Sequence, residues 1–197
     1  MEVFKMKKII ALIMVVVMVL SLVACGGDKE PATDNDNKET TAAKDDNKEI
    51  TGKTYNAGNF SALVPEGWME VAVTDMWSDD PNAVDPNKLQ IIKDGTSEFD
   101  ILTKAYVQID YYGPETDMMA PSSEWYEEAS DLEPIVAGGY TWKGFSAVSG
   151  GNPMTVLYTG EAGGPQFQAT LWSNGGSTIS AADADVLAIL ESVKPAA

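Results

Sequence analysis

The sequence predicts an α+β fold, an antiparallel β-sheet of about six to nine strands flanked by helices. Two observations support this prediction. Short segments in which apolar and polar residues alternate are separated by turns rich in glycine and proline, and the last segment has the apolar spacing of an amphipathic helix. Because the strand candidates are joined mostly by short turns, we expect them to pair antiparallel. About 147 residues have ordinary globular composition, which suits a single domain at 51–197.

The first strand candidates lie on either side of the turns Ala57-Gly58-Asn59 and Pro65-Glu66-Gly67. The clearest alternation follows in the segment that ends at Tyr112, where Val107 and Ile109 share one face with Ala105. Strands are predicted at Lys53–Asn56, Phe60–Val64, Trp68–Val73, Leu89–Ile92 and Ile101–Tyr112, with a long acidic loop at Thr74–Asn87.

The second half of the domain combines four strand candidates with two helices. Gly144 interrupts one of these strands and indicates a bulge. Strands are predicted at Pro134–Ala137, Tyr140–Val148, Met154–Thr159 and Gln166–Trp172, and a short helix at Ser122–Leu132. A C-terminal helix is predicted at about 181–194, because Ser180 and Asp183 resemble a capping box and Pro195 prevents continuation. Its apolar face is expected at Ala182, Val186, Ile189, Leu190 and Val193.

The charge balance excludes several classes of function. Asp and Glu number 30 against 13 positive residues, all of them lysine, and the formal net charge is −17. Such a chain lacks the basic face that nucleic-acid binding requires, so no nucleic-acid partner is expected. It contains no His, which removes the commonest general base and the commonest metal ligand.

The N-terminus carries the pattern of an export signal. Lys5, Lys7 and Lys8 precede the apolar run Ile9–Val23, which is shorter than the ~20 residues that a membrane-spanning helix needs. The run ends in Leu22, Val23, Ala24 and Cys25, which resembles the lipobox of bacterial lipoproteins.

The lipobox resemblance implies a processing site and a localisation. Residues 1–24 would be the signal peptide, and Cys25 would carry a diacylglycerol with palmitate-type acyl chains. Two acyl chains hold a protein stably on a bilayer. The remainder of residues 25–50 is polar and acidic, and is expected to be a disordered tether. The domain is therefore expected on the extracytoplasmic face of a cell membrane, with the membrane as a partner through the lipid on Cys25. Cys25 is the single Cys, so no disulfide and no thiolate metal site are expected in the domain.

The order of elements also resembles the PsbP-like fold. The similarity rests on an early strand running into Pro-Glu-Gly-Trp at Phe60–Trp68, a strand meander, and a closing helix with Ile189–Lys194. It covers about residues 53–195. Proteins of this fold include an extrinsic protein of photosystem II, a nuclear-transport factor and many bacterial lipoproteins. Most of them are accessory or binding proteins, so the resemblance implies a binding or accessory role and transfers no site residue.

Two groups of side chains are candidates for a ligand or metal site. Oxygen ligands crowd the acidic loop and suit calcium, although their spacing is not that of an EF-hand: Asp75, Asp79, Asp80, Asn82 and Asp85, with Asn87 beside them. Trp77 in this loop and Trp172 on the polar side of its strand are candidate ligand contacts. No other cofactor is indicated.

The sequence leaves three functions open, with no catalytic residue assigned. The first is a membrane-anchored binding or accessory module for a protein, peptide or glycan. The second is a carboxylate- or metal-dependent hydrolase of cell-wall or environmental polymers, for which a second acidic region supplies carboxylates. That region comprises Asp110, Glu115, Asp117, Glu124, Glu127, Glu128, Asp131 and Glu133. The third is a calcium-stabilised interaction domain.

Cys25→Ala is expected to abolish lipid attachment, because the thiol of Cys25 is the acceptor that the lipobox implies. Metabolic labelling with radioactive palmitate, followed by mass spectrometry of the purified protein, measures this. Ser21→Ala, which lies in the apolar run, serves as the control and should keep the label. A wild-type protein that takes up no label would show that the lipobox prediction is wrong.

Overall fold

The computed structural model describes residues 50–196, so the predicted signal peptide, lipobox, Cys25 and tether lie outside the described residues. The α+β class is confirmed: antiparallel strands dominate and one α-helix lies near the C-terminus. Within the described residues there are eleven strands, more than the six to nine predicted, because the structure adds the short strands β6 and β11.

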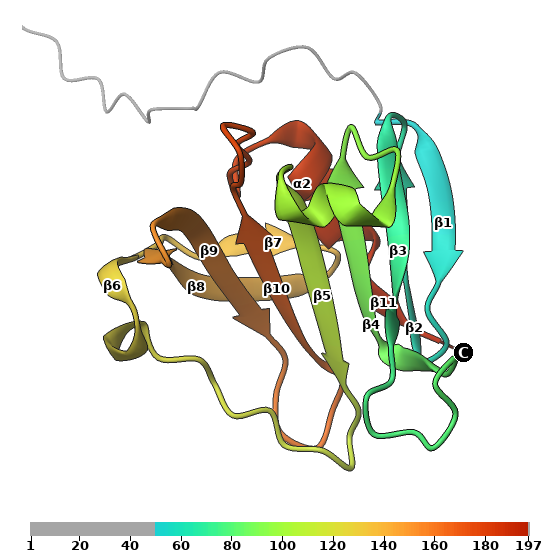
Figure 1. Ribbon diagram of the computed structural model, residues 1–197. Helices are drawn as coiled ribbons and strands as arrows, with labels where there is room; N and C mark the ends of the chain where they lie inside the picture. Colours follow the sequence, from blue (N-terminus) through green and yellow to red (C-terminus); the bar gives the residue numbers. More distant parts are fainter. Residues whose placement is uncertain (1–49, 197) are drawn as a thin grey trace, which may run out of the picture. The chain divides into compact units, whose positions relative to one another are not determined.

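The larger sheet has eight strands (Figure 1). Seven of them follow the order β3-β4-β5-β10-β9-β8-β6, and the eighth, β7, lies off this path and pairs with β8. Every pairing in it is antiparallel, as the short turns predicted. Its strands are β3 (Trp68–Thr74), β4 (Val84–Lys93), β5 (Tyr106–Tyr112), β6 (Glu127–Asp131), β7 (Ile135–Ala137), β8 (Tyr140–Ser149), β9 (Asn152–Thr159) and β10 (Gln166–Trp172).

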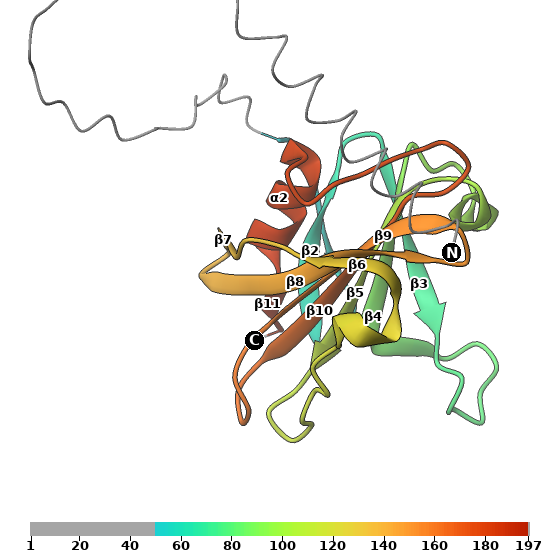
Figure 2. The same ribbon diagram turned by 90° about the vertical axis from the view of Figure 1, so that its left-hand side faces the viewer.

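One face of the large sheet is covered by the helix and by a second, small sheet. The small sheet has the order β1-β2-β11, with β1 at Gly52–Asn56, β2 at Phe60–Pro65 and β11 at Lys194–Pro195. Figure 2 shows α2 (Ala184–Ser192) and β2 on the same side of the large sheet. We call this side the covered face and the opposite side, which faces the viewer in Figure 1, the open face.

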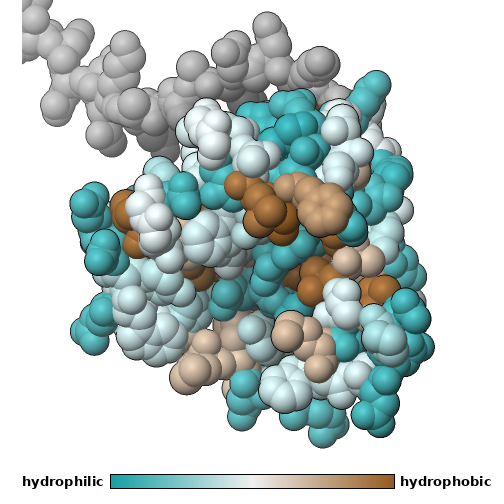
Figure 3. Space-filling view, in the orientation of Figure 1, coloured by the Kyte–Doolittle hydropathy of each residue, from teal (hydrophilic) through white to brown (hydrophobic). Residues whose placement is uncertain are grey.

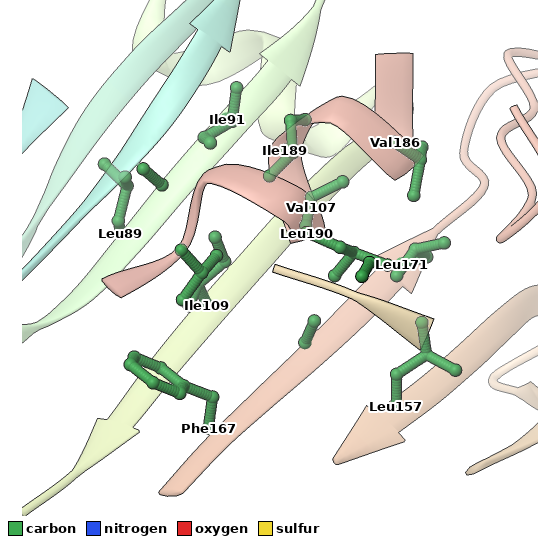
Figure 4. Packing of buried hydrophobic residues seen from close by; sticks show 14 of the residues in the cluster. Leu89, Ile91, Val107, Ile109, Leu157, Phe167, Leu171, Val186, Ile189 and Leu190 are labelled. Atoms are coloured by element: carbon green, nitrogen blue, oxygen red, sulfur yellow. The ribbon is translucent and has the colours of Figure 1, made fainter. Parts of the chain in front are cut away.

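The hydrophobic core lies between the large sheet and this cover. Val186, Ile189 and Leu190 of α2 are fully buried and meet apolar side chains from the strands of the large sheet, as Figure 4 shows. Two hydrogen bonds attach the helix to the neighbouring strands: the Leu63 amide donates to Ser192 Oγ at 2.6 Å, and Trp68 Nε1 donates to Asp185 Oδ2 at 3.2 Å. The strand residues of this contact are Leu89, Ile91, Val107, Ile109, Leu157, Phe167 and Leu171.

The C-terminal helix is confirmed, but it is shorter than the predicted 181–194. It begins at Ala184 because Asp183 stays extended, and the Asp183 carboxylate binds the Ser180 amide and hydroxyl instead. Ala182 therefore precedes the helix and is exposed. At the other end Val193 is extended, and Lys194–Pro195 pairs with β2.

The predicted helix at Ser122–Leu132 is wrong. Its first residues form only a 3-10 turn, η2 (Ser123–Trp125), and the chain then extends as strand β6 along β8. The local glutamates favoured a helix, but the free edge of β8 supplies backbone partners that a short exposed helix lacks. A bulge in β6 places Glu128 at a φ of 51°.

Two predicted boundaries near the acidic loop also change. The loop is shorter than Thr74–Asn87, because β4 begins at Val84 and pairs there with Thr74 of β3. Asp85 and Asn87 consequently belong to a strand. Ile101 lies in a second 3-10 helix, η1 (Glu98–Leu102), so the predicted strand Ile101–Tyr112 begins only at Tyr106.

Gly144 does not mark a bulge in its pairing with β9. Gly144 pairs with Leu157 in an unbroken register, and the Leu132 amide donates to its carbonyl from the other side at 2.9 Å. A Cβ on this residue would lie 1.9 Å from the Val156 carbonyl oxygen. The glycine is required by the close approach of the two backbones.

Gly144→Ala is expected to lower the free energy of unfolding by about 1–3 kcal/mol, because the added methyl overlaps a backbone atom that cannot move alone. Urea denaturation followed by circular dichroism measures this change. Gly164→Ala is the matched control, since its Cβ would meet nothing closer than 3.5 Å. Equal midpoints for the two variants would contradict the steric explanation.

Candidate functional site

Polar side chains form a continuous ladder across the open face of the large sheet. Gln90, Gln108 and Thr170 lie opposite one another on β4, β5 and β10. Gln90 Nε2 donates to Gln108 Oε1 at 3.0 Å, and Gln108 Nε2 donates to the Asp110 carboxylate at 3.0 and 3.3 Å. Figure 3 looks onto this face and shows hydrophilic side chains in its middle, between hydrophobic groups over η1 and toward the β3 edge.

Asp110 ends this ladder and is buried, with 7% of its surface exposed. It lies between Lys88 of β4 and Gln168 of β10 in the sheet register. Burial raises the pKa of the Asp110 carboxyl, and the nearby charge of Asp85 acts in the same direction, whereas the Gln108 amide and the Lys88 charge lower it. A carboxylate that is desolvated in this way marks a candidate functional site.

A cavity of about 300 Å³ opens beside Asp110. It lies at the end of β5, beside the loop that joins β3 to β4 and the first residues of β4. We call it the Asp110 cavity, and its lining residues are Trp77, Asp85, Asn87, Lys88, Asp110, Tyr111, Tyr112, Gly113 and Thr116. Its volume is at the lower end of the range for small-molecule sites.

The walls of the cavity are held in place by local contacts. Lys88 Nζ lies 3.3 Å from Asp85 Oδ2, and Asp85 Oδ1 accepts the Asn87 amide at 2.9 Å. On the far side, the Thr116 carbonyl accepts a hydrogen bond from the buried Gln166 at 3.1 Å, which fixes the segment after β5 against the sheet. The cavity therefore has both charged and aromatic walls.

The carboxylates predicted to bind calcium are not brought together. Asp75 Oδ1 accepts the Trp77 amide, and Asp80 Oδ1 accepts the Asn82 amide, each at 2.9 Å, so these groups stabilise tight turns within the loop. Asp79 is exposed, and Asp85 pairs with Lys88 in the cavity wall. Within residues 50–196, no three acidic side chains converge in a way that would hold a metal ion.

The two tryptophans proposed as ligand contacts have different surroundings. Trp77 lines the Asp110 cavity and is 94% exposed. Trp172 lies on the open face, as the alternation predicted, but it stacks on Tyr106 with ring centroids 6.3 Å apart. It packs there against a small apolar cluster that includes Phe145 and Met154. Trp172 is therefore part of a packed cluster outside the cavity.

Only one residue of the second acidic region enters the cavity. Asp110 is buried, whereas Glu124, Glu127 and Asp131 are exposed on η2 and β6. The cavity instead combines Asp110 with Asp85, which comes from the first acidic group. Lys88, Tyr112 and Thr116 were not predicted as site residues. Alternation along β5 puts Asp110 and Tyr112 on one face, but the partner strand that supplies Lys88 cannot be read from it.

A larger cavity of about 410 Å³ lies between β1, β2 and the start of β3. Its polar side chains already bind other side chains: Lys53 Nζ lies 2.6 Å from Glu70 Oε1, and Thr51 Oγ1 donates to Glu66 Oε2 at 3.1 Å. Trp68 Nε1 donates to Asp185. This arrangement stabilises the junction of the two sheets and leaves fewer groups for a ligand than the Asp110 cavity offers.

Together these features define an antiparallel α+β domain with one buried carboxylate in a small polar cavity. No protein-family model matches the chain, and no curated protein matches it. Two solved structures are similar in part. A protein of Bacteroides thetaiotaomicron has 12% identity and a TM-score of 0.42 over 74% of this chain, which spans about half (49%) of that protein's length.

The second similar structure is LpqN of Mycobacterium tuberculosis, which is described as involved in cell envelope biogenesis. It has 13% identity and a TM-score of 0.40, covering 75% of this chain and 91% of LpqN. Similarity at this level supports no statement about function, and the PsbP-like resemblance stays a prediction. Among residues 50–196, no helix has the length and apolar character needed to cross a bilayer.

Asp110→Asn is expected to raise the melting temperature near pH 7. Burial raises the pKa of Asp110 above its ordinary value of 3.8, so the folded protein holds this proton more tightly and loses stability as the pH rises through that range. The amide removes the buried charge and keeps an acceptor for Gln108. Below the ordinary pKa, at about pH 3, wild type and variant should converge.

Differential scanning calorimetry at both pH values measures this effect. Asp79→Asn is the control, because it removes a charge at an exposed position in the loop between β3 and β4 and should leave the melting temperature unchanged. A lower melting temperature for Asp110→Asn at neutral pH would contradict the interpretation that the buried charge is costly.

Proposed function

We propose that residues 50–196 form a ligand-binding module, held on the extracytoplasmic face of a bacterial membrane by a lipid on Cys25. The ligand is a small polar molecule, or one polar group of a peptide or glycan. The observation that carries this proposal is the Asp110 cavity, in which a buried carboxylate, an ion pair and an exposed indole line one space. Binding sites commonly combine a few convergent polar groups with aromatic walls.

The conformation of the cavity supports binding without a large rearrangement. Asp85 and Lys88 are held by their ion pair, and Asp110 by Gln108. Their side chains project from adjacent strands, β4 and β5, which are paired in register. A site built on rigid strands loses little conformational freedom when a ligand binds. Trp77, on the loop, is the lining residue that is almost fully exposed and can adapt to the ligand.

Titration of the full chain in neutral detergent tests this function. The probes are a panel of soluble mono- and disaccharides and short peptides, read out by tryptophan fluorescence and calorimetry. Trp77→Ala should weaken the binding of any active probe about two- to tenfold, as the loss of an aromatic contact predicts. Trp125→Ala is the matched control, because Trp125 is exposed and lies outside the cavity.

Two outcomes would contradict the proposal. One is a panel in which no probe binds wild-type protein. The other is a probe that binds equally well to wild type and to both tryptophan variants.

A second candidate function is favoured by the carboxylate pair in the cavity. Asp85 and Asp110 line the same space, and burial raises the pKa of Asp110, as hydrolysis by an acid and a base requires. An assay for new reducing ends, with soluble cell-wall polysaccharide as substrate, tests this function. Hydrolysis by wild type that both Asp110→Asn and Asp85→Asn abolish would support the hydrolase over the binding module.

A further inference from the structure

The charges of the Asp110 cavity are unequal. Its lining carries two carboxylates, Asp85 and Asp110, and one ammonium group, Lys88. Lys88 is 3.3 Å from Asp85 Oδ2 and forms an ion pair with it. The second carboxylate, Asp110, therefore leaves the cavity with a net negative charge, which disfavours an anionic ligand.

Asp110 has more acceptor positions than the protein fills. A carboxylate offers about four lone-pair sites, and among residues 50–196 the one side chain that donates to Asp110 is Gln108. Because the group is 7% exposed, water has little access to it. A buried charge with few partners is costly unless an opposite charge pairs with it. Lys88 already acts on Asp110 with its positive charge, and a cationic ligand would add a second positive charge and further donors.

An exposed aromatic ring completes the site. Trp77 lines the cavity and is 94% exposed, so its indole is open to a ligand. Tryptophan faces attract ammonium groups more strongly than other aromatic side chains do, and aromatic walls recur in sites for quaternary ammonium ligands. A metal ion would gain little from the indole, whereas an organic cation gains from both the ring and the carboxylate.

The charge of the whole domain acts in the same direction. Residues 50–197 hold six lysines and 21 acidic residues, a net charge of −15. A field of this sign concentrates cations near the surface and repels anions. Neutral ligands gain nothing from it.

We propose that the Asp110 cavity binds an organic ammonium ion, which pairs with the Asp110 carboxylate and contacts the indole of Trp77. This inference rests on the proposed ligand-binding function and names the chemical class of its ligand. Lys88 keeps its ion pair with Asp85, which leaves the Asp110 carboxylate as the partner of the ligand.

The experiment compares probes that differ only in charge. Choline and ethanolamine carry an ammonium group, and 3,3-dimethyl-1-butanol has the shape of choline with a carbon in place of the nitrogen. Each is titrated into the full chain in neutral detergent, with calorimetry and tryptophan fluorescence as readouts. At least one ammonium probe should bind at least tenfold more tightly than the neutral alcohol, and raising the salt concentration should weaken its binding.

Variants locate the binding in the cavity. Asp110→Asn should weaken the ammonium probe at least tenfold, and Trp77→Ala about two- to fivefold, as expected for an exposed cation–π contact. Asp79→Asn is the matched control for the loss of one negative charge, and it should leave the affinity for the ammonium probe unchanged. Melting temperatures of all variants confirm that they are folded.

The outcomes separate this inference from the proposed function. Equal binding of the neutral alcohol and choline, lost in Trp77→Ala, would overturn the ammonium assignment and leave the binding function standing. Binding of neither ammonium probe would also overturn it, and the saccharide and peptide panel would then decide the function. Millimolar calcium that stabilises wild type but not Asp110→Asn would assign the cavity to a divalent cation and overturn the inference.

Discussion

The architecture of this domain depends on a large sheet that carries the helix and the small sheet on one face. The helix α2 and the strand β2 lie over the same side of the eight strands, and the apolar side chains of β4, β5, β9 and β10 bury against them. Because side chains alternate along a strand, each buried residue leaves its neighbours on the open face. The burial of Leu89, Val107 and Ile109 therefore places Lys88, Gln108 and Asp110 together on the other side.

The open face is not simply a solvated surface. Gln166, Thr170 and Asp110 are each less than a tenth exposed, because the sheet carries further chain over part of this side. The segment after β5 binds Gln166 through the Thr116 carbonyl. Polar groups covered in this way must find hydrogen bonds. Thr170 accepts a hydrogen bond from Gln168, and Asp110 accepts one from Gln108. Burial nevertheless raises the pKa of Asp110.

The position of the cavity can be compared with the point at which the described chain begins. Residue 50, where the described chain begins, leads into β1 at one end of the sheets, whereas the loop after β3 and the segment after β5 lie at the opposite end (Figure 1). The cavity is lined by residues of these two segments. The cavity therefore lies at the end of the sheets opposite to the one at which residue 50 leads into β1.

The sequence alone determined the α+β class, the strand Gln166–Trp172 to the residue, and the buried face of the C-terminal helix at Val186, Ile189 and Leu190. These features depend on periodicity and on turns, which are local. The sequence also singled out Trp77, Asp85 and Asp110, but in separate groups with separate roles. It failed at Ser122–Leu132, where the local helix preference lost to the backbone partners on the edge of β8.

Only the tertiary structure decided which of these residues meet. The pairing of β4 with β5 sets Lys88 opposite Asp110. The pairing of β3 with β4, which begins at Thr74 and Val84, places Asp85 in a strand and in the wall of the cavity. Burial raises the pKa of Asp110, and the residues that line the cavity with it come from β4, from the loop before β4 and from the segment after β5. Periodicity in the sequence assigns a residue to one face of a sheet. The register between strands and the segments packed over the sheet determine which side chains become its neighbours. These neighbours determine the chemistry of a site.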